Sequence, residues 1–334
     1  MPLASRKKAV SICARLLVVA RERRRDYRLV LHSYIIERLL SRLSLSRHKD
    51  RLVLRGGVLL SAWLGDATRC GTRLELLSRD AAETGIIPDS LHEILSPNED
   101  GIDFAVGTPK AMFAPGRSGA AGISIDIASV LENARLAVSI DVCFGDVVFP
   151  GPGEVLYPTL LGDPAPRLRC NRPETAVAEA LQHIVVGRTE LPDLITLRDV
   201  FLLIRRFDFE ARPLARSIYT TFRRRATVLP ASLPAVLSLS RGRLRGCQAR
   251  WRLLQATDPL LKDVDLVSDC LPVIASFVEP VLEAIAGTAF SLGRWQAGGP
   301  WSRPSPRRAP EKGPGGGTHQ PHNPQKSVRA KSAT

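Results

Sequence analysis

The most informative pattern of apolar and polar positions runs from Val53 to Leu77. An apolar segment of strand-like composition ends at the glycine pair Gly56-Gly57, and a second apolar segment continues to Trp63. The next short apolar segment carries one acid, Glu75, between two leucines. Because glycine accepts the backbone angles of tight turns, this order predicts a strand, a glycine turn, a helix and a strand that presents an acidic side chain.

The N-terminal part of the chain has helical periodicity instead. Apolar spacing predicts one helix over residues 8–24 and a second from its N-cap, Asp26, to about Leu45. Apolar residues of the second helix fall on one side, at Leu31, Ile35, Leu39 and Leu43. We therefore expect these helices to support a sheet formed by the segments that follow.

The C-terminal half returns to helical spacing after Pro173. The pattern predicts four further helices: Glu174 to Val186, Leu194 to Phe209, Leu214 to Arg225 and Asp258 to Ala286. Pro272 and Pro280 should kink the last of these helices. Trp295 and Trp301 are the last residues that we expect to dock on this helical part, because prolines, glycines and charges dominate afterwards.

The middle of the chain has a weaker pattern. The interval from Asp80 to Gly122 shows little periodicity and contains four prolines, at 88, 97, 109 and 115. A clear strand pattern reappears from Val138 to Asp146 and carries Asp141 between apolar neighbours. Five prolines between residues 150 and 166 then exclude a long helix.

Two acids and two glycines in these segments are the candidate chemistry. Glu75 and Asp141, on different predicted strands, are the candidate catalytic residues and metal ligands. Carboxylates on neighbouring strands can hold two Mg²⁺ ions about 3.5–4 Å apart for in-line displacement at phosphorus. The backbone N–H groups at Gly56 and Gly57 are the candidate nucleotide-binding groups, because glycine lets the backbone approach phosphates. Asp146 lies in a Gly-Asp turn and is either a further metal ligand or a turn residue.

Several longer blocks resemble the AbiEii/AbiGii toxin family of nucleotidyl transferases. The similar blocks read IIERLLSRLSLSRHKDRLVLRGG, IDVCFGDVVFPGP, YPTLLGDPAPRL, RPETAVAEA and DVFLLIRRFDF. The resemblance extends from about Arg15 to Trp301. It implies an NTP substrate, Mg²⁺ as cofactor, an acceptor such as tRNA, and a cognate antitoxin protein as partner.

The chain departs from the family pattern on its acidic strand. Members of the family typically read R-P-T-R-D-[LI]-D-L-L, whereas residues 69–77 here read RCGTRLELL. Arg73 therefore stands at the first catalytic aspartate position, and Glu75 stands at the second. A local change of reading frame in the history of the gene would explain both Arg73 and the weak pattern from Asp80 to Gly122.

Two further family positions differ in the predicted helical part. The lysine of a V-A-E-K motif corresponds to Ala180, and the first aspartate of a K-D-x-x-D-L motif corresponds to Thr196. Glu179 and Asp199 match the acids of these motifs that remain. Each is interpreted either as a group that supports the site or as a member of an ion pair on a helix surface.

Composition sets the limits of this interpretation. The chain has 334 residues, 44% of them hydrophobic, and a net charge of +14. This charge favours acidic partners such as RNA or nucleotide phosphates, although basic residues such as Arg21 to Arg25 also occur simply as solvated helix ends. The six cysteines have no metal-site or disulfide spacing, and no segment has the length of a membrane span, so we expect a cytoplasmic protein without membrane contact.

These observations together predict an α/β (α+β) protein with a nucleotidyltransferase-like mixed sheet. The expected domains are N-terminal helices over residues 1–50, the sheet core over 51–168, a helical domain over 169–301 and a disordered basic tail over 302–334. The resemblance implies a nucleotidyl transferase like the toxins of type IV toxin–antitoxin systems, which would move a nucleotide from an NTP to an acceptor such as tRNA. The four departures predict impaired activity. The alternatives are a catalytically inactive relative and a basic RNA-binding protein.

Overall fold

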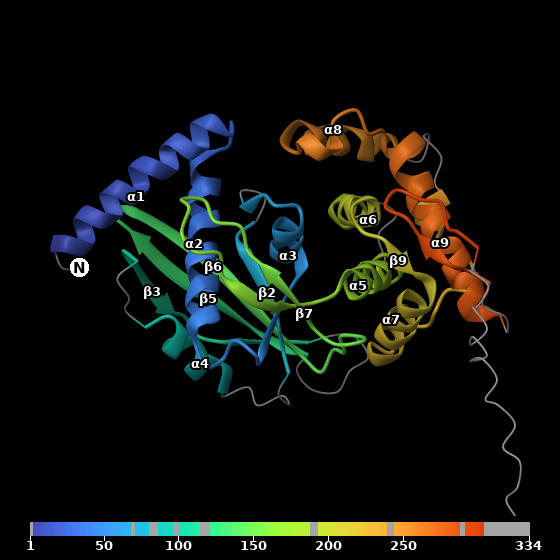
Figure 1. The fold of residues 1–334 in the computed structure, drawn as a ribbon, viewed down its shortest axis with the longest axis horizontal. Helices are drawn as coiled ribbons and strands as arrows, with labels where there is room; N and C mark the ends of the chain where they lie inside the picture. Colours follow the sequence, from blue (N-terminus) through green and yellow to red (C-terminus); the bar gives the residue numbers. More distant parts are fainter. Residues whose placement is uncertain are drawn as a thin grey trace, which may run out of the picture. The chain divides into compact units, whose positions relative to one another are not determined.

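The computed structural model describes residues 3–67, 71–79, 86–96, 100–113, 121–187, 193–238, 244–287 and 291–303 (Figure 1). All but the first two residues of the predicted basic tail lie outside these ranges. In the described part of the chain, no helix is long and apolar enough to cross a membrane.

The two N-terminal helices form as predicted. They are α1 (Leu3–Glu22) and α2 (Tyr27–Leu45). The carboxylate of Asp26 caps α2 by accepting a hydrogen bond from the backbone N–H of Leu29 at 3.1 Å. The predicted apolar side of α2 is buried and packs with strand residues in one hydrophobic core (Figure 1).

The sheet is mixed and has eight strands, which confirms the predicted fold class. Its order is β3-β5-β6-β2-β1-β8-β7, and β4 pairs with β5. The central strands are β1 (Leu52–Arg55), β2 (Arg73–Ser78) and β6 (Ala134–Phe144). β1 and β2 are antiparallel, whereas β2 and β6 are parallel. The helix α3 (Gly56–Trp63) follows β1 directly, so the predicted order of strand, glycine turn, helix and acidic strand is confirmed.

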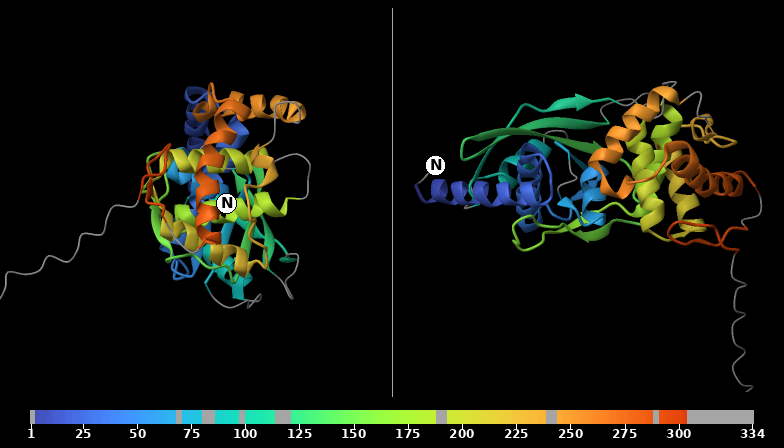
Figure 2. Two further views of the ribbon diagram at one scale, coloured as in Figure 1. Left: turned by 90° about the vertical axis from the view of Figure 1, so that its right-hand side faces the viewer. Right: turned by 90° about the horizontal axis from the view of Figure 1, so that it is seen from above.

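The interval from Asp80 to Gly122 is more regular than its sequence suggests. It contains α4 (Ile86–Ile94), β3 (Ile102–Val106) and β4 (Lys110–Met112), and it leads into β5 (Gly122–Leu131). Both β3 and β4 pair with β5, and β5 pairs with β6 along its whole length (Figure 2). The weak sequence pattern of this interval therefore does not correspond to a lack of helices and strands among its described residues. β3 and β4 are stabilised by hydrogen bonds to β5, which lies later in the chain. Pairing with a distant strand does not require a periodic pattern of apolar residues within the short strand itself.

One buried arginine anchors this interval to α2. The guanidinium of Arg42 contacts both carboxylate oxygens of Asp100, at 2.8 and 2.6 Å. It also donates hydrogen bonds to the backbone carbonyls of Leu95, Ser96 and Ile102. The Arg42 side chain is only 3% exposed, so these bonds replace the water that burial removes.

The helical part has its own hydrophobic core. Its longer helices are α5 (Pro173–Val186), α6 (Leu194–Arg206), α7 (Ala211–Arg224), α8 (Arg245–Thr257) and α9 (Leu271–Ala286). Shorter elements complete it: η2 (Ala235–Ser238), η3 (Pro259–Leu261), η4 (Leu266–Cys270), and the paired strands β9 (Phe209–Glu210) and β10 (Arg294–Trp295). The last two strands of the sheet, β7 (Gly153–Leu156) and β8 (Arg167–Cys170), come before α5 in the chain.

The predicted long helix from Asp258 to Ala286 does not exist as one element. Asp258 and Asp265 each cap a new short element through their side chains, which divides the segment into η3, η4 and α9. Pro272 lies in the first turn of α9, where proline is tolerated, and Pro280 lies inside this helix. The preceding helix, α8, was not predicted.

The tryptophans at the end of the described chain dock on the helices as predicted. Trp295 is 1% exposed, and its indole N–H donates to the carbonyl of Ile204 at 2.8 Å. The indole N–H of Trp301 donates to the carbonyl of Phe277 at 3.0 Å, and the two rings stack. Both tryptophans therefore bury an apolar ring and satisfy its polar atom.

Candidate functional site

The glycine turn and Glu75 are in direct contact. Arg55, the last residue of β1, is the register partner of Glu75 on β2. Gly56 then begins α3 with a φ of +69°, and a Cβ at this position would overlap the Glu75 carboxylate. Both the backbone angle and the close approach require glycine here. The acid predicted as a metal ligand therefore lies against the turn predicted to bind phosphates.

The structure also brings Glu75 and Asp141 together. They are register partners on the parallel strands β2 and β6. Their side chains therefore lie on the same face of the sheet. Asp141 is 7% exposed and Glu75 is half-buried.

Arg73 occupies the neighbourhood of these acids. It lies two residues before Glu75 on β2, on the same face of the sheet, and its guanidinium forms an ion pair with Oδ2 of Asp141. The hydroxyl of Ser124 on β5 donates to Oδ1 of Asp141 at 2.6 Å. Both carboxylate oxygens of Asp141 thus have protein partners. The hydrogen bond with Asp141 and the attraction of its charge raise the pKa of Arg73, so the guanidinium stays charged.

These side chains do not fit a magnesium site. Mg²⁺ requires several oxygen ligands in near-octahedral geometry. Here one of the two acids is engaged by a permanent cation and a hydroxyl. Among the residues that the structure describes, no group of three or more His, Cys, Asp or Glu side chains could hold a metal ion.

A third acid on the same face of the sheet was missed in the sequence. Asp126 on β5 accepts a hydrogen bond from the Ser139 hydroxyl at 2.8 Å and pairs with Lys110 at 3.1 Å. The Ser139 hydrogen bond and the Lys110 contacts lower the pKa of Asp126. Its spacing of two from Ser124 is the signal that could have found it, since alternate residues of a strand share a face.

A ring of four charges, one buried and three half-buried, lies beside the glycine turn. Arg55 contacts Asp146 at 2.9 Å and Glu179 at 3.0 Å. Arg225 contacts the same two acids, at 2.7 and 3.4 Å. We call these four residues the charge ring. They come from β1, the turn after β6, α5 and the C-cap of α7, so the ring joins the sheet to the helical part.

The two acids of the charge ring differ in their pKa. Burial would raise the pKa of Asp146, but the charges and hydrogen bonds of Arg225 and Arg55 lower it below its ordinary value. Burial raises the pKa of Glu179 in spite of the same two arginines. Burial likewise opposes the charge of Arg55, yet Glu179 and Asp146 hold its pKa above the ordinary value. Asp146 is therefore the firmly ionised acid of the ring.

The remaining sequence candidates lie elsewhere in the structure. Asp146, which follows β6, and Glu179 of α5 are both members of the charge ring. Thr196 donates to the carboxylate of Asp193 at 2.9 Å in the first turn of α6. Asp199 contacts its neighbour Arg198 at 2.6 Å. Ala180 packs against the core of the helical part.

The N-terminal arginines are more engaged than a solvated helix end would be. Arg23 and Arg25 contact Asp66, just beyond α3, at 3.4 and 3.5 Å. Arg25 also donates to the carbonyl of Thr257 at the end of α8. These contacts tie the end of α1 to two other parts of the chain.

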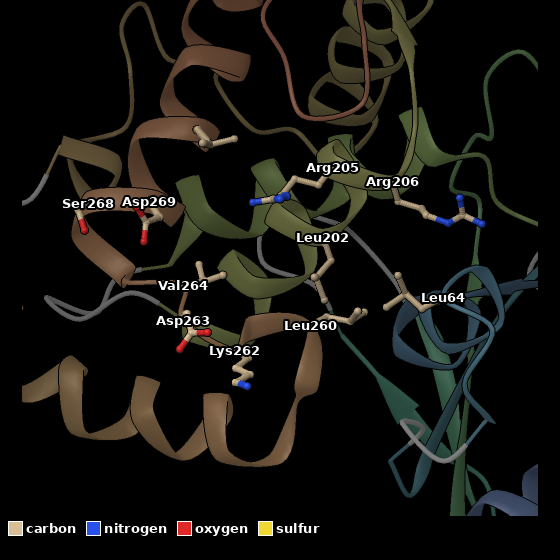
Figure 3. A pocket seen from close by; sticks show the side chains of 11 residues that line it. Leu64, Leu202, Arg205, Arg206, Leu260, Lys262, Asp263, Val264, Ser268 and Asp269 are labelled. Atoms are coloured by element: carbon tan, nitrogen blue, oxygen red, sulfur yellow. The ribbon is translucent and has the colours of Figure 1, made fainter. Parts of the chain in front are cut away.

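A cavity of about 880 Å³ lies away from Glu75 and Asp141. Figure 3 shows Arg205 and Arg206 of α6 at its wall, with Lys262 and Asp263 from the segment after η3. Its lining includes none of the four residues proposed from the sequence as catalytic or nucleotide-binding. The cations at the end of α6 also suit the negative end of the helix dipole, so their presence alone does not indicate a ligand.

Comparisons with known proteins agree with the blocks noted in the sequence. A family model described as nucleotidyl transferase AbiEii toxin, type IV TA system, matches residues 38–266. This range includes the whole interval from Asp80 to Gly122. No curated protein sequence gave a match.

Solved structures of low sequence identity also match the chain. MenT4, a nucleotidyltransferase toxin from Mycobacterium tuberculosis, is 19% identical with a TM-score of 0.47, and the match covers 61% of this chain and 68% of MenT4. JHP933 from Helicobacter pylori is 13% identical with a TM-score of 0.39, and the match covers 78% of this chain and 94% of JHP933.

Proposed function

Because the chain belongs to the AbiEii nucleotidyl transferase toxin family of type IV toxin–antitoxin systems, we propose that it is a member with weak or absent nucleotide transfer. The reaction at issue is transfer of a nucleotide from an NTP to an acceptor, for which tRNA is our proposal. The observation that carries the proposal is the ion pair between Arg73 and Asp141 beside Glu75. In this chain the positive side chain of Arg73 neutralises Asp141, one of the two candidate acids.

The charge of Arg73 acts against a divalent cation in two ways. It occupies an oxygen of Asp141 that would otherwise be a ligand. It also repels the ion: at an effective dielectric constant of 20, two unit charges 4 Å apart interact by about 4 kcal/mol. We therefore propose that Glu75 and Asp141 do not bind Mg²⁺ tightly while Arg73 is present.

Two other positions support weak transfer. Ala180 offers no positive charge to a triphosphate where the resembled pattern has lysine. The Thr196 hydroxyl is engaged with Asp193 at the start of α6. Gly56 and Gly57 remain our candidates for nucleotide contact, and an antitoxin protein remains our proposed partner.

Restoring the acids and the lysine tests the proposal. Arg73→Asp alone should improve metal binding and leave transfer poor. The quadruple change Arg73→Asp, Glu75→Asp, Ala180→Lys and Thr196→Asp should produce transfer of the labelled nucleoside monophosphate from an NTP to tRNA, with release of pyrophosphate, in the presence of Mg²⁺. The matched control adds Asp141→Ala to the quadruple variant and should abolish the gain.

The unmodified protein gives the decisive counter-result. If it transfers labelled nucleotide to tRNA robustly, and Asp141→Ala abolishes this transfer, the proposal is wrong. The chain would then be a working transferase in which Arg73 moves away from Asp141 or takes part in the reaction.

A further inference from the structure

The charge ring connects the two strands that flank the acidic strand. Arg55 ends β1 directly before Gly56, and Asp146 follows the last residues of β6. In the sheet order, β2 lies between β1 and β6. A single oxygen, Oδ2 of Asp146, contacts both Arg55 and Arg225, at 2.9 and 2.7 Å. The ring therefore links the residue before the glycine turn to the end of the strand that carries Asp141.

Residues of the helical part also contact the Gly145-Asp146 turn and the end of β1. Arg224 donates to the carbonyl of Gly145, next to Asp146, and Arg225 donates to Gln182 on α5 at 2.9 Å. Asn171 donates to Glu179 at 3.2 Å, and its backbone N–H donates to the carbonyl of Leu54 at 2.9 Å. Contacts from α5, α7 and β8 thus converge on the chain around Arg55.

We propose that Asp146 is a positioning residue for the glycine turn. Its carboxylate holds Arg55, and through Arg55 it fixes the place of Gly56 and Gly57 relative to Glu75 and Asp141. That the glycine turn contacts a nucleotide rests on the function proposed above. That Asp146 fixes the position of this turn does not depend on that function. Asp146 acts through Arg55, because Arg55 precedes the turn and Asp146 bonds the Arg55 guanidinium.

The charges of the ring explain why Asp146 has this role. With all four members ionised, the signs alternate and the net charge is zero. Neutralising Asp146 leaves two arginines to share Glu179, whose pKa is raised by burial. Like charges in a partly dehydrated environment repel strongly, so the arginines should separate and Arg55 should move. The backbone that follows Arg55 should move with it.

The test compares Asp146→Asn with Asp100→Asn in the full chain. Asp100 is the matched control, because it also pairs with a buried arginine, Arg42, but Arg42 lies on α2 and not beside the glycine turn. Asp146→Glu keeps the charge and serves as the conservative variant. Hydrogen exchange of the backbone amides of residues 54–60 is measured for each variant, with exchange of the sheet amides of β5 as the internal reference.

We expect amide exchange at residues 54–60 to be about tenfold faster or more in Asp146→Asn than in Asp100→Asn, relative to the β5 amides. Asp146→Glu should restore most of the protection. If both Asn variants change exchange in residues 54–60 equally relative to β5, Asp146 contributes only to global stability and the proposal is wrong. Unchanged protection in Asp146→Asn would overturn it as well.

A second readout links the position of the turn to ligand binding. A fluorescent NTP analogue is titrated into the same variants without an RNA acceptor. Asp146→Asn should weaken its affinity about tenfold, with little change in Asp100→Asn, because a displaced glycine turn would no longer direct its backbone N–H groups at the phosphates. If the analogue binds both variants equally, the turn does not contact the nucleotide, and the exchange result alone decides the positioning role. Transfer activity in the unmodified protein would contradict the proposed function without affecting either readout.

Discussion

The charge ring and the pair Arg73–Asp141 are both ion pairs beside the glycine turn, but they have opposite consequences. In the ring, two arginines and two acids alternate, and each charge has partners of opposite sign. On the sheet, the side chain of Arg73 is 58% exposed and pairs with Asp141. Asp141 is the register partner of Glu75. The first arrangement supports the framework around Glu75 and Asp141, and the second, on our proposal, removes negative charge that a metal ion would need. A fold can therefore keep its framework while its chemistry changes.

The largest expected difference is in stability. Arg225→Ala removes one cation from the charge ring and leaves Asp146 and Glu179 with only Arg55, so it should cost about 3–5 kcal/mol of unfolding free energy. Arg73→Ala removes an exposed cation and should cost less than about 1 kcal/mol. Chemical denaturation with urea measures both variants. Equal losses would show that the two ion pairs do not differ as proposed.

The glycine pair should show a second, smaller contrast. Gly56→Ala puts a Cβ at a φ of +69° and into the Glu75 carboxylate, so it should cost about 1–3 kcal/mol. Gly57→Ala meets no atom within 4 Å and should change stability by at most about 1 kcal/mol. Thermal unfolding of the two variants checks this. Combining Gly56→Ala with Glu75→Ala should recover part of the loss, and no recovery would contradict the contact with Glu75.

Acid should weaken the ring in a defined direction. The pKa of Asp146 is lowered, so its stabilising contribution is complete above the ordinary aspartate pKa of about 3.9 and is lost as the pH falls through the lower folded value. The charged groups in contact with Asp146 are Arg55 and Arg225, and its charge also acts on Glu179 and on the Cys143 thiol. The stability difference between the unmodified protein and Asp146→Asn should therefore shrink as pH falls from 6 to 3. A difference that grows in acid would contradict this sign.

The smallest expected effect concerns metal affinity. Arg73→Asp replaces a cation by an acid beside Asp141 and should tighten Mg²⁺ binding by about tenfold or more, measured by calorimetric titration. Lys110→Asp makes the same change of charge on the edge strand β4, next to Asp126. This control should have a weaker effect because surface charges are screened over about 8–10 Å. Equal gains in both variants would indicate a general charge effect.

The features that could be predicted from the sequence are those that depend on local patterns of residues. The glycine turn between β1 and α3, the acids Glu75 and Asp141, and the cap at Asp26 all follow from spacing and residue type. The strands β3 and β4 were missed because β5 supplies their hydrogen bonds and lies later in the chain. The predicted C-terminal helix was wrong in its first part, from Asp258 to Cys270, because side-chain caps at Asp258 and Asp265 divide this segment into short elements, whereas its end at Ala286 agrees with α9.

The charge ring was beyond sequence reasoning for a different reason. Arg55 and Arg225 are separated by 170 residues, and each belongs to a segment with a plausible local role as a surface group. Only packing of α5 and α7 against the ends of β1 and β6 makes them neighbours. Arg73 shows the converse, because it lies two residues before Glu75 and alternate residues of one strand share a face.

The docking of Trp295 and Trp301 sets practical limits for engineering the chain. These indoles fasten β10 and the following residues to α6 and α9 through the carbonyls of Ile204 and Phe277. A fluorophore or affinity tag joined after Arg303 would start from a fixed anchor point. A truncation before Trp295 would instead uncover the ring of Phe277 and the apolar surface around it, and a soluble preparation would become prone to aggregation.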